Sequence, residues 1–143
     1  MSTCFYLTSI KFEKTLSDGM VKKVTEAYLV NAMSFTEAEA RIIEHMTPYI
    51  VGEFTVSSVR RMRLAGIVYD ASSTDPFFYN VKINISTIDE KTGEEKTSQM
   101  RYLVTAKDFD SAVKSFKDYM KGSMCDWSLH SVQETKIIDY VMQ

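Results

Sequence analysis

Tyr28-Leu29-Val30-Asn31-Ala32 recurs along the chain as Tyr102-Leu103-Val104-Thr105-Ala106, at an offset of 74 residues (102 − 28). The same offset relates four further identities, which are Gly19 and Gly93, Phe35 and Phe109, Ala38 and Ala112, and Met46 and Met120. Because the matches are spread over a long stretch, one short chance identity does not explain them. The sequence therefore predicts two copies of one structural unit.

Each copy has the pattern of two strands, a helix and a further strand. The strands expected in the first copy are 5–12, 24–32 and 54–59, and those expected in the second are 81–85, 100–106 and 127–132, with 135–141 as a continuation. Ser17-Asp18-Gly19 and Lys91-Thr92-Gly93-Glu94 are expected to turn the two hairpins, because Gly adopts the positive φ that tight turns need. In the first strand of the second copy, Val81, Ile83 and Ile85 alternate with polar residues, as a sheet with one wet face requires.

Two helices are expected, each beginning at a capping residue. Ser34 with Glu37 fits a capping box, in which Glu37 reaches back to the Ser34 amide. Asp108 is the corresponding cap in the second copy. Helical spacing predicts four core residues on the helices, namely Phe35, Ile42, Phe109 and Phe116.

The predicted fold class is α+β, with two tandem ββαβ units related by pseudo-two-fold symmetry, an antiparallel sheet and helices on one face. We expect residues 1–69 to form the first unit, 70–76 a polar linker and 77–143 the second unit. One such unit is too small to bury its helix and sheet well, so the two are expected to pack as one domain.

Composition excludes several protein classes. The chain has 143 residues, 45% of them hydrophobic, and a formal net charge of −2, which argues against disorder and against a surface that is basic throughout. No apolar run approaches the length of a bilayer span, and the N-terminus lacks a signal-peptide pattern. The two cysteines do not make a disulfide framework. We therefore expect a cytoplasmic protein with no membrane partner.

The residues 24–30 and 34–41, together with Gly52-Glu53-Phe54, are similar to an uncharacterised family known as domain of unknown function 4494. The resemblance covers nearly the whole chain. It implies an origin in gut Bacteroidetes, their phages or mobile elements, and a cytosolic setting. It implies no activity and no functional residues.

Catalytic and metal-binding patterns are missing from the sequence. The soft ligands Cys4, His45, Cys125 and His130 lack the paired spacing of a zinc site. Neither a nucleophile elbow nor a phosphate loop is present. We expect a non-enzymatic protein without metal or cofactor.

The basic cluster Arg60, Arg61 and Arg63 is the most suggestive feature. The matching positions in the second copy carry Gln133, Glu134 and Lys136, so the copies have diverged here. Arginine suits bidentate phosphate contact. A solvated edge, or ion pairs with neighbouring glutamates, is the alternative interpretation.

Aromatic residues near strand starts could add a stacking surface. Phe77, Phe78 and Tyr79 cannot all point inward, because strand side chains alternate, so at least one is expected to be exposed or at an interface. Phe78, Tyr79 and Trp127 join the arginines as candidate ligand-binding residues, since single-strand binders stack bases beside a basic groove. Strands also use such residues as core.

Two functions follow from these patterns. The first is binding of a phosphate-bearing ligand, either a small host-defence signalling nucleotide that is sequestered or single-stranded nucleic acid. The second is a protein–protein adaptor or an inhibitor of a host protein. We also expect a homo-oligomer, whose symmetric interface would suit a small enclosed ligand.

Overall fold

A computed structural model of the chain describes residues 4–69 and 76–142, and it confirms the α+β class. The elements in chain order are β1 (Cys4–Thr15), β2 (Val21–Ala32), α1 (Phe35–Met46), β3 (Phe54–Met62), β4 (Gly66–Val68), β5 (Phe77–Ile88), β6 (Glu95–Ala106), α2 (Phe109–Met120), β7 (Asp126–Glu134) and β8 (Ile137–Val141). The predicted linker falls, except for Pro76, outside the described residues. Within the described ranges, no helix is long and apolar enough to cross a membrane.

The strands form two four-stranded sheets, with the orders β3-β1-β2-β8 and β4-β6-β5-β7. Hairpins make the β1–β2 and β5–β6 pairs antiparallel, as predicted. The sheets are nevertheless mixed, because β8 pairs parallel with β2 and β4 pairs parallel with β6. A parallel neighbour cannot be joined by a tight hairpin, so each of these strands reaches its sheet by a longer connection.

The chain divides into two compact units that do not coincide with the sequence repeats. Unit 1 comprises Met1–Arg63 and Lys136–Gln143, and unit 2 comprises Leu64–Thr135. Each repeat therefore gives its last strand to the sheet of the other repeat, so the ends of the units differ from the boundaries expected at residues 69 and 77. Exchanging every strand for its counterpart in the other repeat converts one strand order into the other. The pseudo-two-fold relation stays a prediction.

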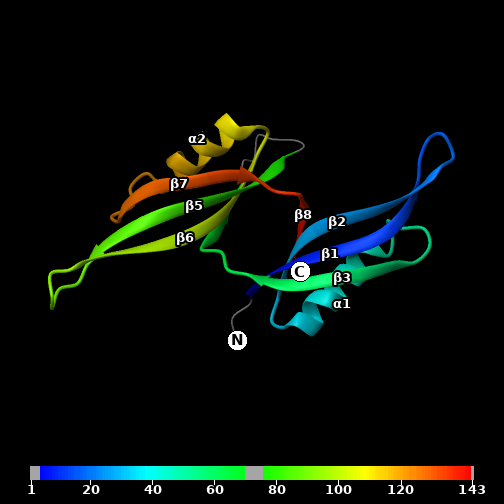
Figure 1. The fold of residues 1–143 in the computed structure, drawn as a ribbon, viewed down its shortest axis with the longest axis horizontal. Coiled ribbons are helices and arrows are strands. Elements are labelled where there is room, and N and C mark those ends of the chain that lie inside the picture. Colours follow the sequence, from blue (N-terminus) through cyan, green and yellow to red (C-terminus); the bar gives the residue numbers. More distant parts are fainter. Residues whose placement is uncertain (1–3, 70–75, 143) are drawn as a thin grey trace. The chain divides into compact units, whose positions relative to one another are not determined.

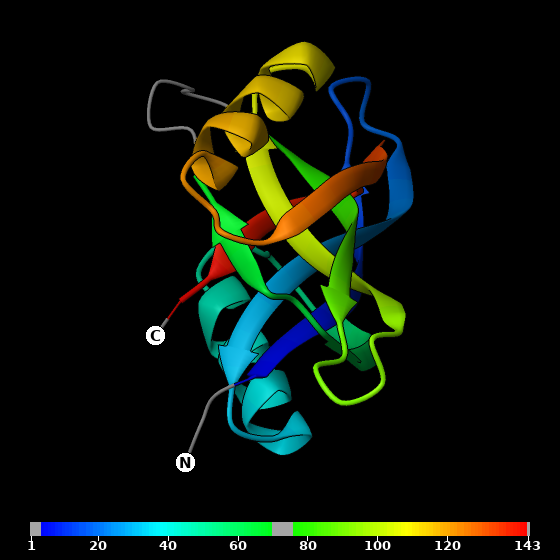
Figure 2. The same cartoon turned by 90° about the vertical axis from the view of Figure 1, so that its left-hand side faces the viewer.

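Each unit has its own core between a helix and one face of a sheet (Figures 1 and 2). In unit 1, Ala38, Ile42 and Met46 of α1 pack on the sheet residues Tyr6, Ile10, Tyr28, Val30, Ala32 and Val141. In unit 2, Ala112, Phe116 and Met120 of α2 pack on Val68, Tyr79, Val81, Ile83, Tyr102, Val104 and Ala106. Burial of these side chains is the main stabilising contribution to each unit.

Two of the four predicted core residues on the helices are confirmed, and two are wrong. Ile42 and Phe116 are fully buried, whereas Phe35 is 53% and Phe109 51% exposed. Both exposed rings are the first residue of their helix. The buried stripe follows an i, i+4, i+8 row that begins three residues later, so the first residue lies at its margin. The ring of Phe35 still packs edge-to-face on Tyr6, with ring centroids 4.9 Å apart.

The predicted caps and turns are confirmed, with one difference. Ser34 Oγ accepts a hydrogen bond from the Glu37 amide at 3.1 Å, and Asp108 Oδ1 accepts one from the Ser111 amide at 2.8 Å. The Glu37 carboxylate does not complete a capping box; it pairs with Arg41 at 2.6 Å, because an i,i+4 guanidinium offers a charged partner. In the hairpins, Gly19 and Gly93 have φ values of 85° and 72°.

Candidate functional site

The arginines Arg60, Arg61 and Arg63 are here called the basic edge; Arg60 and Arg61 lie at the end of β3, and Arg63 follows its last residue, Met62. This strand is an edge of the unit 1 sheet, because it pairs only with β1 (Figure 1). All three side chains are exposed. An edge strand also presents backbone N–H and C=O groups that its own sheet does not use.

Register determines which face each arginine of β3 occupies. Arg60 lies opposite Leu7, and Arg61 lies opposite Tyr6. Tyr6 belongs to the face that packs on α1, so Arg61 points to the helix side and Arg60 to the other side. The basic edge therefore presents guanidinium groups on both sides of one strand, rather than a flat patch on one face.

The guanidinium groups of the basic edge are not neutralised locally. The ion pairs found in the described part of the chain are Arg41 with Glu37, Lys96 with Asp89 and Lys121 with Asp118. The ion pairs with glutamates that the alternative interpretation invokes are thus not seen for these arginines. Unit 1 holds nine lysines and arginines against eight acidic residues, and unit 2 holds eight against eleven. The basic edge therefore lies on the less acidic unit.

The predicted aromatic residues belong to unit 2, whereas the basic edge belongs to unit 1. Phe78 is 3% and Tyr79 5% exposed, so neither ring offers a face for stacking. Burial, followed by the charges of Glu134 and Asp108, raises the pKa of Tyr79. Phe77 is the exposed member of its triplet, at 50%, which confirms that the three cannot all be buried.

Trp127, the remaining candidate, is half-buried on β7. Its ring packs edge-to-face on the core residue Phe116, with centroids 5.7 Å apart. It serves the unit 2 core at least in part, as strand-borne aromatic residues commonly do. The six predicted residues are therefore divided between the two units.

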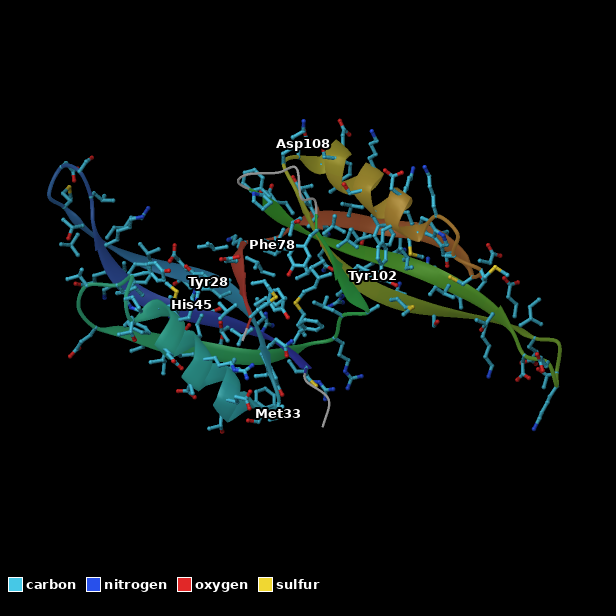
Figure 3. All side chains as sticks on the ribbon, turned by 180° about the vertical axis from the view of Figure 1, so that it is seen from behind. Tyr28, Met33, His45, Phe78, Tyr102 and Asp108 are labelled. Carbon is cyan, nitrogen blue, oxygen red and sulfur yellow. The ribbon has the colours of Figure 1, made fainter. Side chains whose placement is uncertain are left out.

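A hollow of about 780 Å³ in unit 1 was not predicted, and we call it the helix-side cleft. It is lined by Phe12, Glu13, Lys14, Thr15, Glu26, Tyr28, His45, Met46, Tyr49, Ile50, Val51, Ile138 and Asp139. Tyr28 and His45 lie close together in Figure 3, where α1 ends. The cleft combines β1, β2, β8 and the segment after α1, and the distance of β8 in sequence explains why periodicity could not reveal it.

Tyr28 lies in the cleft lining together with two carboxylates, those of Glu26 and Asp139. The Tyr28 hydroxyl donates to Glu26 Oε1 at 3.1 Å. Burial, then the charges of Glu26 and Asp139 with the Glu26 hydrogen bond, raise the pKa of Tyr28 well above its ordinary value. A second hollow of about 740 Å³ adjoins it and shares Phe12, Glu13 and Val51. The arginines of the basic edge line neither hollow.

Metal-binding side chains do not gather within the described residues, where no group of three or more His, Cys, Asp or Glu side chains could hold an ion. Cys4 and Cys125 are free thiols.

Comparison with known proteins places the chain in a family without assigning it an activity. The sequence model of a family described as Domain of unknown function (DUF4494) matches residues 4–143. The chain belongs to this family. No curated protein and no solved structure matches the DUF4494 chain significantly. Its function therefore has to be argued from its own side chains.

Proposed function

We propose that this DUF4494 chain is a non-enzymatic binding protein whose basic edge contacts the phosphate groups of a nucleotide or of single-stranded nucleic acid. The observation that carries the proposal is the exposure of Arg60, Arg61 and Arg63 without an ion pair among the described residues. A guanidinium group offers a planar fork of donors that matches two phosphate oxygens.

The position of the arginines favours a ligand that approaches an open edge. Arg60 and Arg61 extend to opposite sides of β3, so a phosphate chain lying along the strand would meet donors on both sides. Because Phe78 and Tyr79 are buried, base stacking on them does not support this proposal. Phosphate contact with little preference for base identity is the expected behaviour.

The test replaces Arg60, Arg61 and Arg63 together by lysine, which keeps the charge and removes the fork. Calorimetric titration of cyclic nucleotides and single-stranded oligonucleotides, at two salt concentrations, should show weaker binding by the variant. The matched control is Arg101→Lys, an exposed arginine on β6 of unit 2. Equal binding by wild type and the triple variant, or no binding of any ligand by wild type, would refute the proposal.

Salt dependence separates the two ligand classes. For a single strand, log K falls with log salt by about 0.7 per phosphate contact, so three arginines contribute a slope of about −2. A variant with three glutamines in place of the arginines should lose that contribution. A small nucleotide with one or two phosphates should show a shallower slope.

A second candidate, an adaptor that binds protein, is favoured by exposed apolar side chains elsewhere on unit 1. Val51 is 99% and Tyr49 73% exposed, and both line the helix-side cleft. Large apolar side chains grouped at a surface commonly mark association sites. If a second copy is the partner, sedimentation velocity at rising protein concentration should show self-association that Val51→Ser weakens. A chain that stays monomeric over the range would exclude this homo-oligomer.

A further inference from the structure

The helix-side cleft brings carboxylates and aromatic rings from separate elements to one hollow. The carboxylates are Glu13, Glu26 and Asp139, and the rings are Phe12, Tyr28, His45 and Tyr49. Lys14 is the lysine among the lining residues. The volume of the cleft, about 780 Å³, lies in the range of small-molecule sites, roughly 300–1,000 Å³.

Glu26 and Asp139, two of these carboxylates, lie beside one buried phenol. Tyr28 is 6% exposed and donates its hydroxyl to Glu26. In the parallel β2–β8 pair, Asp139 lies directly opposite Tyr28. Asp139 and Glu26 therefore flank the same ring from two strands. The raised pKa of Tyr28 agrees with this negative environment.

Two aromatic side chains of the cleft lining, Tyr49 and His45, lie together. Tyr49, which is 73% exposed, follows α1, and its ring centroid lies 5.8 Å from that of His45. Aromatic faces attract cations through the ring quadrupole, and the attraction is strongest where water is partly excluded. A cation bound in the cleft would be surrounded by a lining that includes the Tyr49 ring and the carboxylates of Glu26 and Asp139.

Unit 2 provides an internal comparison at the same positions of the fold. Tyr102 corresponds to Tyr28, and the residue opposite Tyr102 in the parallel β4–β6 pair is Gly66, where unit 1 has Asp139. Met100, two residues before Tyr102, replaces Glu26. The ring of Tyr102 packs there on Tyr119, with centroids 5.9 Å apart. The pair of carboxylates from Glu26 and Asp139 is therefore specific to unit 1, although unit 1 is the less acidic unit.

We propose that the helix-side cleft binds an organic cation, through an ammonium or guanidinium group placed between the carboxylates of Glu26 and Asp139 and the ring of Tyr49. The shared chemistry fits a small quaternary amine or the side chain of a basic peptide. This site is separate from the basic edge, and its ligand has the opposite charge. The failure of one proposal leaves the other standing.

The test pairs each cation with a neutral molecule of the same shape. Choline is compared with dimethylbutanol, its uncharged carbon isostere, and a short arginine peptide with the same peptide carrying citrulline. Calorimetry on the full chain should detect choline or the arginine peptide and not its neutral partner. Choline alone identifies a small ammonium ligand, and the arginine peptide alone identifies a peptide guanidinium.

Variants assign the binding to the cleft. Glu26→Gln and Asp139→Asn should each lower the affinity for the cation by about tenfold, because each variant loses one charge-assisted contact. Asp139 is exposed, so its variant tests the site even if Glu26→Gln disturbs Tyr28. Glu39→Gln, on the exposed side of α1 and outside the cleft lining, is the control that should bind normally. The proposal is overturned by equal binding of a cation and its neutral partner, by unchanged affinity in both cleft variants, or by no binding of either cation.

Discussion

Replacing Phe116 by alanine tests the helix register of unit 2 directly. The side chain is fully buried and its ring contacts those of Tyr102, Trp127 and Tyr119, with centroid distances of 5.2, 5.7 and 6.4 Å. Removing a buried Phe leaves a cavity as well as losing apolar burial, so the free energy of unfolding should fall by about 3–5 kcal/mol. Urea titration measures the loss, and Trp127, the single tryptophan, reports it through fluorescence.

Phe109→Ala is the matched control, because Phe109 lies on the same helix and is 51% exposed. Full burial of such a side chain contributes roughly 1.5–3 kcal/mol. Because Phe109 is only about half buried and its removal leaves no enclosed cavity, the free energy of unfolding should fall by about 1 kcal/mol. Similar losses for the two variants, or a loss below about 1 kcal/mol for Phe116→Ala, would refute the assignment of the buried face.

Three further predictions concern the cap of α2, the cleft phenol and β8. The Ser111 hydrogen bonds lower the pKa of Asp108, so the stabilisation by the charged carboxylate should be present above the ordinary carboxyl pKa and disappear as pH falls through the lowered value. Asp108→Ala should therefore lower the free energy of unfolding at neutral pH and lower it less in acid, as measured by urea titration. Burial raises the pKa of Tyr28 from 10.0, so wild type should lose stability as pH rises above that value, and Tyr28→Phe should remove part of this alkaline loss in thermal melts. Val141→Ala should lower the free energy of unfolding by about 2 kcal/mol, because Val141 is 5% exposed in the unit 1 core, whereas Met142→Ala, at a 64% exposed position, should change it little when unfolding is followed by circular dichroism.

Local features of the fold were predictable because they depend on neighbouring residues. The Asp108 cap, the turn at Gly93 and the alternation from Val81 to Ile85 each express a short-range preference that the sequence displays directly. The partners of β4 and β8 were not predictable, since both strands pair with residues more than thirty positions away. Periodicity reports which face of a strand is apolar, and it contains no information on which sheet receives that strand.

The same limit applies to the candidate sites. Three arginines within four residues are visible in the sequence, and their exposure at the edge of a sheet agrees with that pattern. The burial of Phe78 and Tyr79 depends on packing of both sheet faces, which the triplet alone could not decide. The pairing of Tyr28 with Asp139 joins residues 111 positions apart (139 − 28), so the cleft emerges only in three dimensions.

Because each repeat contributes its last strand to the other unit, the two units can complete their sheets only in a fixed order during synthesis. Unit 1 contains β1 to β3, which leave the ribosome first, yet its sheet is complete only after Ile137–Val141 has emerged. Domains usually fold as units during synthesis, from the N-terminus onward. Here unit 2 is entirely synthesised before unit 1 has its last strand. The β2 edge and part of the unit 1 core therefore remain open throughout translation of residues 64–135, and the unit that begins first is the one that finishes last.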